Sequence, residues 1–279
     1  MSDQAYYLPL ESTGDGVERF ATTALTVSTW ADTMQHGAPP SALLVRALER
    51  CEPRPDTRLT RVVIEILGPV PLSEIEVRSW VERPGKRVEL VVAELWAAGP
   101  DGTQRAVARG TGWRMQTADT TAVQHAADPA LAPLSQSHTT PMDGRFWGTG
   151  FVATLDWQWL ADIGCEGPGQ VWARPNPVLV EGESLTPIQR LFTVADVANG
   201  VGAKLHPNEW TYLNTDLTVH LFRVPTGEWV GISAETSYGP DGVGMCAGVL
   251  HDESGPVGRI NQTVQLSLSL LHILLCLII

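Results

Sequence analysis

Apolar helical segments and strand-like runs follow one another along the chain, and turn residues separate them. A Gly/Pro turn at residues 36–40 leads into Ser41–Arg50, whose apolar period and Pro-led start predict a buried helix. A Thr-rich run before that turn, Ala24–Trp30, predicts a strand. Four longer strand-like runs come after the helix, bounded by Pro and Gly turns: Leu59–Val70, Glu74–Glu82, Arg87–Trp96 and Arg105–Met115.

The same order of elements returns in the second half of the chain. Thr186, Pro187 and Gln189 have the spacing of a capping box with proline at the first helical position. This spacing predicts a helix that runs through about Gly200. Four strand-like runs follow it: Tyr212–Phe222, Glu228–Tyr238, Gly242–His251 and Val257–Leu266.

The two halves align with each other. Leu59–Pro71 lies against Leu213–Pro225 at a constant offset of 154 residues, and Gly85 meets Gly239 at the same offset. A duplicated unit of one helix and four strands is therefore the strongest signal of organisation in the sequence. Because one helix covers one face of an antiparallel sheet, the two units are expected to pair into an α+β fold.

The segments between and after the two units differ from them in composition. Residues 117–146 are rich in Ala, Thr, Ser and Pro without a sustained period, which indicates a connector. We expect an N-terminal unit at 15–116, a connector at 117–165, a C-terminal unit at 166–266 and an apolar tail at 267–279. The tail is interpreted as an extra buried strand, a tail anchor or a frameshifted end. It is too short for a standard membrane span of about 20 residues.

Composition and charge narrow the function classes. The chain has 279 residues, 43% of them apolar and 18% charged, as in a globular protein. Its formal net charge of −12, without a basic block, argues against nucleic-acid binding. Four scattered cysteines and a start without an export signal predict a cytoplasmic protein with reduced thiols. The seven histidines are dispersed, so we expect no metal and no cofactor.

Asp196 is the first candidate for chemistry. It is the only formal charge in the apolar stretch Leu191–Val201. An unpaired buried carboxylate costs several kcal/mol, so Asp196 is expected to be hydrogen-bonded, catalytic or on the solvent side of its helix. If it is buried beside a pocket, its pKa rises and it can act as a general base.

Four other residues are weaker candidates when each is considered alone. Gln262, which matches Gly112 in the first half, and Asn214 carry amides that could orient a water molecule, or they are ordinary strand residues. His36 and Gly37 precede the first helix, where backbone N–H groups could hold an oxyanion, or they form a tight turn.

Taken together and in order, these features resemble the acyl-CoA thioesterase II family. The resemblance covers roughly residues 15–265 and includes the segments VADVANGVGAKL, LNTDLTVHLFRVPTGEW and SYGPDGVG. It implies a double hotdog fold, in which a curved antiparallel sheet wraps each helix and the two sheets join into one. It also implies hydrolysis of fatty acyl-CoA to a free acid and CoA without a metal.

The resemblance implies roles for these candidates. Asp196 would activate a water molecule that Gln262 and Asn214 position, and His36 and Gly37 would bind the substrate or its oxyanion. Asn214 departs from the hydroxyl residue usual in the family, and His36 departs from its Gly-Gly pair.

Basic residues and alternative functions complete the expectations. Arg83, Lys86 and Arg87 are expected to meet the nucleotide phosphates or to form a solvated turn. The alternatives to a thioesterase are a non-catalytic acyl-CoA or lipid-binding hotdog protein and an enoyl-CoA hydratase that uses Asp32 with His36. The expected partner is an acyl-CoA substrate, with no nucleic acid and no stable membrane span. A homo-oligomeric state stays open.

Overall fold

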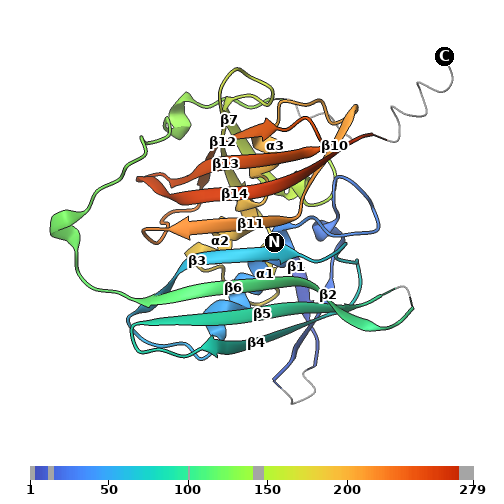
Figure 1. Cartoon of the computed structure of the whole chain (residues 1–279), viewed down its shortest axis with the longest axis vertical. Coiled ribbons are helices and arrows are strands. Elements are labelled where there is room, and N and C mark those ends of the chain that lie inside the picture. Colours follow the sequence, from blue (N-terminus) through green and yellow to red (C-terminus); the bar gives the residue numbers. More distant parts are fainter. Residues whose placement is uncertain (1–3, 12–15, 100, 141–147, 270–279) are drawn as a thin grey trace.

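One continuous sheet of fourteen strands forms the body of the protein (Figure 1). The structure is a computed structural model and describes residues 4–11, 16–99, 101–140 and 148–269. The strands are β1 Ala5–Pro9, β2 Glu18–Thr22, β3 Thr57–Ile66, β4 Ile75–Arg83, β5 Val88–Ala98, β6 Gln104–Gln116, β7 Leu155–Ala161, β8 Gly169–Pro175, β9 Val178–Val180, β10 Trp210–Asn214, β11 Asp216–Leu221, β12 Val230–Tyr238, β13 Val243–Asp252 and β14 Gly255–Leu268.

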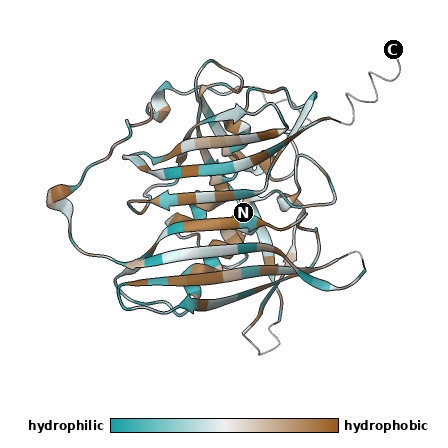
Figure 2. Ribbon diagram, viewed as in Figure 1, coloured by the Kyte–Doolittle hydropathy of each residue, from teal (hydrophilic) through white to brown (hydrophobic). Residues whose placement is uncertain are grey.

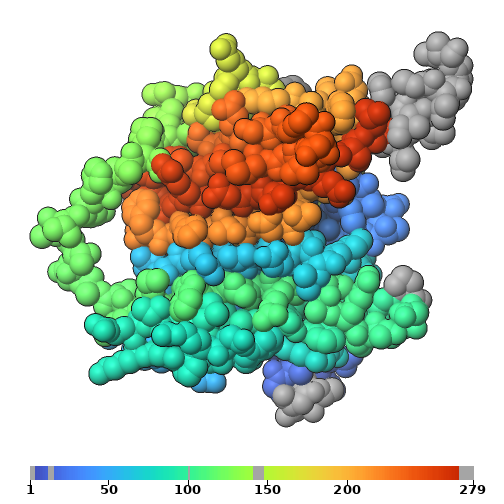
Figure 3. All heavy atoms as spheres, viewed as in Figure 1, coloured from blue at the N-terminus to red at the C-terminus, as the bar shows by residue number. Residues whose placement is uncertain are grey.

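The two halves of the sheet join through their central strands. The strand order is β7-β8-β12-β13-β14-β11-β3-β6-β5-β4-β2-β1-β9, and β10 pairs with β14 outside this path. Strand β11 of the second half pairs antiparallel with β3 of the first, with Leu217 opposite Ile64. Figure 3 shows the halves as adjoining bands of atoms, with the segment after β6 as an arm along the left edge.

Three helices cover one face of the sheet and lie behind it in Figure 1: α1 Ala38–Arg50, α2 Pro187–Ala195 and α3 Ala198–Val201. Helices α1 and α2 pack against each other, and their inward residues, such as Leu44 and Phe192, are fully buried. From Gly258 to Gln265 in β14, buried and exposed residues alternate, as expected for a sheet with one face on the core. Figure 2 shows hydrophilic and hydrophobic residues following one another along most strands. The expected double hotdog architecture is confirmed.

The helix predictions hold with two changes. The first helix begins one turn early, at Ala38, because Pro39 and Pro40 suit the first helical positions. The capping box at Thr186 is present, with its side chain accepting a hydrogen bond from the N–H of Gln189. The predicted helix through Gly200 is instead interrupted after Ala195.

Several strand predictions need correction. The run Ala24–Trp30 is not a strand: residues 24–26 form a 3₁₀ turn, because the Thr23 hydroxyl accepts a hydrogen bond from the N–H of Leu25. The run Tyr212–Phe222 is divided at Thr215 into β10 and β11. Strands β1 and β2 were not predicted, and β7 lies inside the segment expected to be a connector.

The predicted apolar tail lies mostly outside the described residues, since only residues 267–269 of it are described. In the described ranges, no helix has both the length and the apolar character needed to cross a membrane.

Candidate active site

The four candidate side chains and Gly37 meet at the junction of the two helices. Asp196 ends α2 and is 2% exposed. Its Oδ1 accepts hydrogen bonds from Asn214 Nδ2 at 2.7 Å and from Gln262 Nε2 at 3.3 Å. Its Oδ2 lies 3.3 Å from His36 Nδ1. The fold thus gathers residues from the first helix, the second helix and two strands around one carboxylate.

Gln262 also explains why the second helix is interrupted. Its Nε2 donates to the backbone oxygen of Asp196 at 3.2 Å, in place of the helical N–H of Gly200. The N–H of Gly200 instead donates to the backbone oxygen of Val197 at 2.9 Å. The Gln262 Oε1 accepts from the backbone N–H of Asn199 at 2.9 Å, which fixes the orientation of the amide. The interruption therefore places both ends of the Gln262 amide against the helix and its carboxylate.

Gly37 provides the close approach of α1 to this carboxylate. A Cβ atom at Gly37 would lie 2.6 Å from Asp196 Oδ2, so a larger residue would displace the acid. Pro39 and Pro40 have no N–H, and the N–H of Ala38 donates to His36 Nδ1 at 3.1 Å. Among the described residues, the N–H of Gly37 has no partner and remains a donor for a ligand at this helix start.

His36 and Asp196 share one short contact in a buried setting. The His36 side chain is 12% exposed, and its ring centroid lies 4.6 Å from that of Phe151. Burial lowers the pKa of His36, and Asp196 partly opposes this shift. Burial raises the pKa of Asp196, and the contacts with His36, Asn214 and Gln262 oppose that shift. When Asp196 is ionised, His36 Nδ1 must carry the proton in this contact, so it cannot then accept from Ala38.

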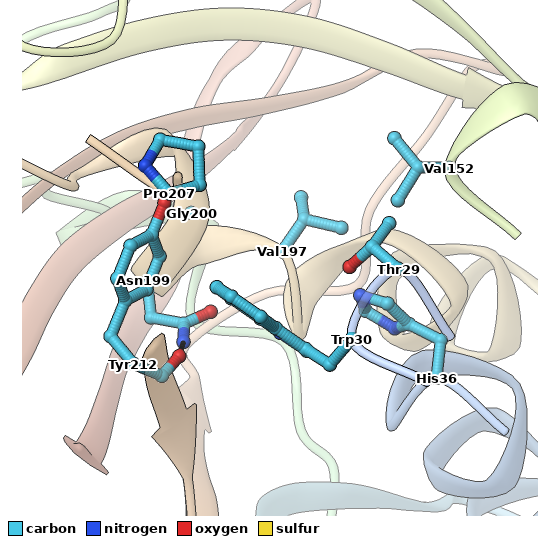
Figure 4. Close-up of a pocket in the computed structure, with 9 residues that line it drawn as sticks. All are labelled: Thr29, Trp30, His36, Val152, Val197, Asn199, Gly200, Pro207 and Tyr212. Carbon is cyan, nitrogen blue, oxygen red and sulfur yellow. Dashed lines mark hydrogen bonds between the residues drawn. The ribbon is translucent and has the colours of Figure 1, made fainter. Parts of the chain in front are cut away.

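Two cavities lie at this site, and Asp196 lines the larger of them. The larger has a volume of about 230 Å³ and is lined by Gly37, Asp196, Asn214 and the loop after β3. The smaller, of about 50 Å³, is mainly apolar and includes Tyr212 (Figure 4). Three residues line both cavities: Trp30, His36 and Asn199. In Figure 4 the Trp30 ring lies between Tyr212 and His36.

The structure separates two sequence-based candidates from this site. Asp32 is exposed, and the carboxylate beside His36 is Asp196, so the expected Asp32–His36 pair is not formed. The turn with Lys86 and Arg87 adjoins the end of β6, beside the start of β3. Ile66 at the other end of β3 lines the larger cavity, roughly 30 Å away at about 3.3 Å per residue. Arg83, which donates to the backbone oxygen of Val88, lies at the same turn. Arg83, Lys86 and Arg87 therefore do not serve this site.

Sequence reasoning missed three residues of the site. Asn199 lies one helical turn after Asp196 and fixes Gln262, a spacing that the sequence does contain. Trp30 and Tyr212 pack edge to face with ring centroids 5.0 Å apart. Their contact joins distant segments, so no local pattern indicated it.

The comparisons with known proteins identify the family of the chain. The model of the acyl-CoA thioesterase N-terminal domain matches residues 26–115, and that of the C-terminal domain matches residues 128–266. A search of curated proteins gave no significant match.

Solved structures give the same answer for the fold. A thioesterase II described as putative from Thermobifida fusca is 18% identical, with a TM-score of 0.70, over 91% of this chain and 94% of that one. A hot dog protein of unknown function from Alicyclobacillus acidocaldarius is 11% identical, with a TM-score of 0.71, over 92% and 95%. The acyl-CoA thioesterase II TesB2 from Mycobacterium marinum is 14% identical, with a TM-score of 0.61, over 94% and 95%.

The fold and the family models define a thioester hydrolase. The chain belongs to the acyl-CoA thioesterase family. Among the described residues, no group of three or more His, Cys, Asp or Glu side chains could hold a metal ion.

Proposed function

We propose that this protein hydrolyses acyl-CoA with a water molecule activated by Asp196. The proposal depends on one observation: a buried carboxylate, held by two amides and a histidine, faces a cavity. Asp196 takes a proton from the water, whose oxygen attacks the thioester carbonyl carbon. The C–S bond then breaks, and the leaving thiolate receives that proton. The products are a free acid and CoA.

Two groups near Asp196 can assist the other steps: one can stabilise the oxyanion, and one can orient the attacking water. The N–H of Gly37 points from a helix start, so it can stabilise the oxyanion that develops on the carbonyl oxygen. Asn214 has both a donor and an acceptor on its side chain. Since its Nδ2 is bound to Asp196, its Oδ1 can accept from the attacking water. The amide thereby replaces the hydroxyl group usual in related proteins.

The sizes of the two cavities suggest which acyl group is used. We assign the pantetheine arm to the larger cavity and the acyl chain to the smaller, apolar one. A water-sized group needs roughly 10–15 Å³ of such a cavity, so 50 Å³ holds only a few carbon atoms. Trp30 and Tyr212 line it, and their rings pack edge to face. The preferred substrate is therefore a short-chain acyl-CoA.

We expect release of free thiol to be fastest with short acyl-CoA substrates and to decline as the chain lengthens. Trp30→Ala should enlarge the smaller cavity and move the optimum to longer chains, because each buried methylene contributes about 0.8 kcal/mol. The measurement is kcat/KM over a panel of acyl-CoA lengths. Trp229→Ala, which lines neither cavity, should leave the profile unchanged. A flat profile, or the same shift in both variants, would contradict the assignment.

A second candidate function is enoyl-CoA hydration. It is favoured by the contact between His36 and Asp196, since a neighbouring acid and base can add water across a double bond. The same panel separates the candidates if it includes a short enoyl-CoA. Hydrolysis releases thiol, whereas hydration removes the conjugated double bond and releases none. Binding without either change would indicate a non-catalytic protein.

The pH dependence of hydrolysis tests whether Asp196 must be ionised for activity. Because the raised pKa of Asp196 lies above the usual 3.8, activity should rise with pH through a midpoint above that value. His36 lowers this pKa, so His36→Gln should move the acidic limb of log kcat/KM to higher pH. Asp32→Asn removes an exposed carboxylate and should not move it. An acidic limb that stays in place, or moves down, in His36→Gln would refute the assignment.

A further inference from the structure

A separate cavity, which we call the second cavity, lies where the end of α1 meets the beginning of α2, away from Asp196. Its volume is about 210 Å³, and its lining includes Glu49, Arg54, Arg58 and Arg114. Glu49 lies near the end of α1 and accepts a hydrogen bond from the hydroxyl of Thr186, which begins α2, at 2.9 Å. At the candidate active site, the end of α2 meets the beginning of α1 in the same way. The two cavities therefore occupy matching places in the duplicated fold.

The duplication relates the residues of the two cavities directly. At the offset of 154 residues, the positions that are identical in the two halves include Pro53 and Pro207, Thr57 and Thr211, and Leu59 and Leu213. Four of these six residues line one of the cavities: Pro53, Thr57, Leu59 and Pro207. Leu213 also lines the larger cavity beside Asp196.

The helices extend the match to the carboxylates. If α1 and α2 are aligned on Pro40 and Pro187, Glu49 falls opposite Asp196. Both carboxylates end a helix beside the start of the other helix. Glu49 is thus the counterpart of the candidate general base.

The second cavity lacks counterparts of the two amides that surround Asp196. The counterpart of Gln262 is Gly112, which has no side chain, and the counterpart of Asn214 is Thr60. The hydroxyl of Thr60 donates to the backbone oxygen of Trp113 at 3.0 Å. The cavity therefore does not repeat the arrangement at Asp196, and the amide that contacts Glu49 is that of Gln189, at 2.7 Å.

Arginines give the second cavity a positive character. Arg58 donates to the backbone oxygens of Leu221 and Phe222, at 3.1 and 2.8 Å, and has no ion pair with a described residue. Arg54 Nη2 is buried and has no hydrogen-bond partner among the described residues. Glu89 neutralises Arg114 and lies 3.1 Å from Arg54 Nε. In a chain with a net charge of −12, this surplus of positive charge is local.

The basic turn between β4 and β5 adjoins this cavity. Arg54 Nη1 donates to the backbone oxygen of Gly85 at 2.8 Å, which holds the turn beside the cavity. Lys86 and Arg87 in the same turn are exposed. Lys86 and Arg87 thus add two positive charges beside Arg54 and Arg58, at the second cavity and not at the candidate active site.

We propose that this second cavity and its basic turn bind the phosphate groups of a nucleotide, as a non-catalytic site distinct from the one at Asp196. Arginine guanidinium groups suit phosphate because several N–H groups can donate at once. Glu89 pairs with Arg114 and with Arg54 Nε, whereas Glu49 is bound by the neutral side chains of Thr186 and Gln189. The donor that remains for an anion is the buried Nη2 of Arg54, unpartnered within the described ranges, beside the guanidinium of Arg58. The nucleotide comes either as free nucleotide or as the nucleotide part of CoA.

The test is binding to the full chain, measured by calorimetry with ADP and with CoA at low salt. We expect ADP to bind at one site and to bind more weakly as salt rises. Arg54→Ala and the double variant Lys86→Ala/Arg87→Ala should each weaken ADP at least tenfold, which is about 1.4 kcal/mol. Arg109→Ala, with the same change in charge at a position that lines neither cavity, should have no such effect.

The candidate active site supplies the second control. Asp196→Asn should bind ADP as the wild type does, whereas CoA should show two binding events in both proteins. If only free nucleotide uses the second cavity, CoA will show one event and will not compete with ADP. The proposal is overturned if ADP gives no heat at millimolar concentration, or if Arg109→Ala weakens it as much as Arg54→Ala. Because binding is measured without turnover, the outcome is independent of the proposed hydrolysis.

Discussion

Asp196→Asn is expected to lower kcat/KM for thioester hydrolysis by about 10²- to 10⁴-fold, the usual contribution of general base catalysis. Asparagine has nearly the same shape and can still interact with Asn214 and Gln262, but it cannot take a proton from water. The expected loss therefore falls on the chemical step and not on the fold. Free thiol release under saturating and subsaturating substrate measures it, and thermal unfolding checks the fold.

Asp32→Asn is the matched control, since Asp32 precedes the same turn but is exposed. It should retain wild-type turnover. Full activity in Asp196→Asn, or a comparable loss in Asp32→Asn, would show that Asp196 is not the base. A variant that unfolds at a much lower temperature would be replaced by Asp196→Ser, which leaves the amides in place but removes the carboxylate.

Local patterns predicted the parts of the fold that local interactions determine. The capping box at Thr186 needs only residues three apart, and it is formed as expected. The long strands of both units are close to their predicted bounds because turns of Pro and Gly delimit them. Asp196 could be singled out because a single charge in an apolar run requires a compensating partner.

Long-range contacts explain what the sequence could not predict. Strand β1 pairs in parallel with β9, so its partner lies more than 170 residues away and no nearby pattern indicates it. The contact between His36 and Asp196 spans the two units in the same way. Even the break after Ala195 depends on Gln262, a residue of the last strand. Each of these features requires the paired units to be assembled first.

The site also shows how one duplicated scaffold yields two different environments. At each of the two places where one helix ends beside the start of the other, a carboxylate is present: Asp196 in one and Glu49 in the other. Gln262 is replaced by Gly112 in the first unit, where a Cβ would lie 2.7 Å from Leu59 Cδ2. A side chain at position 112 would therefore have to displace Leu59, because apolar side chains of the first unit pack closely around this position.

Arg114→Met is expected to destabilise the protein by about 3–5 kcal/mol, the largest effect on folding among these predictions. Arg114 and Glu89 are each 3% exposed, and Arg114 Nε donates to Glu89 Oε1. The guanidinium also donates to the backbone oxygens of Cys51 and Glu52, at 2.8 and 3.0 Å. Methionine fills much of the space but leaves Glu89 buried with only the partly exposed Arg54 beside it.

The double variant Arg114→Met/Glu89→Leu distinguishes an unpaired charge from a loss of packing. Removing both charges should restore a large part of the stability, because the cost arises mainly from the carboxylate left in a dry environment. Urea unfolding at constant pH gives the free energies, and Arg19→Met, which breaks an exposed ion pair with Glu74, should cost less than about 1 kcal/mol. If the double variant is no more stable than Arg114→Met, the bonds of Arg114 to the end of α1 carry the stabilisation instead, and the ion pair does not.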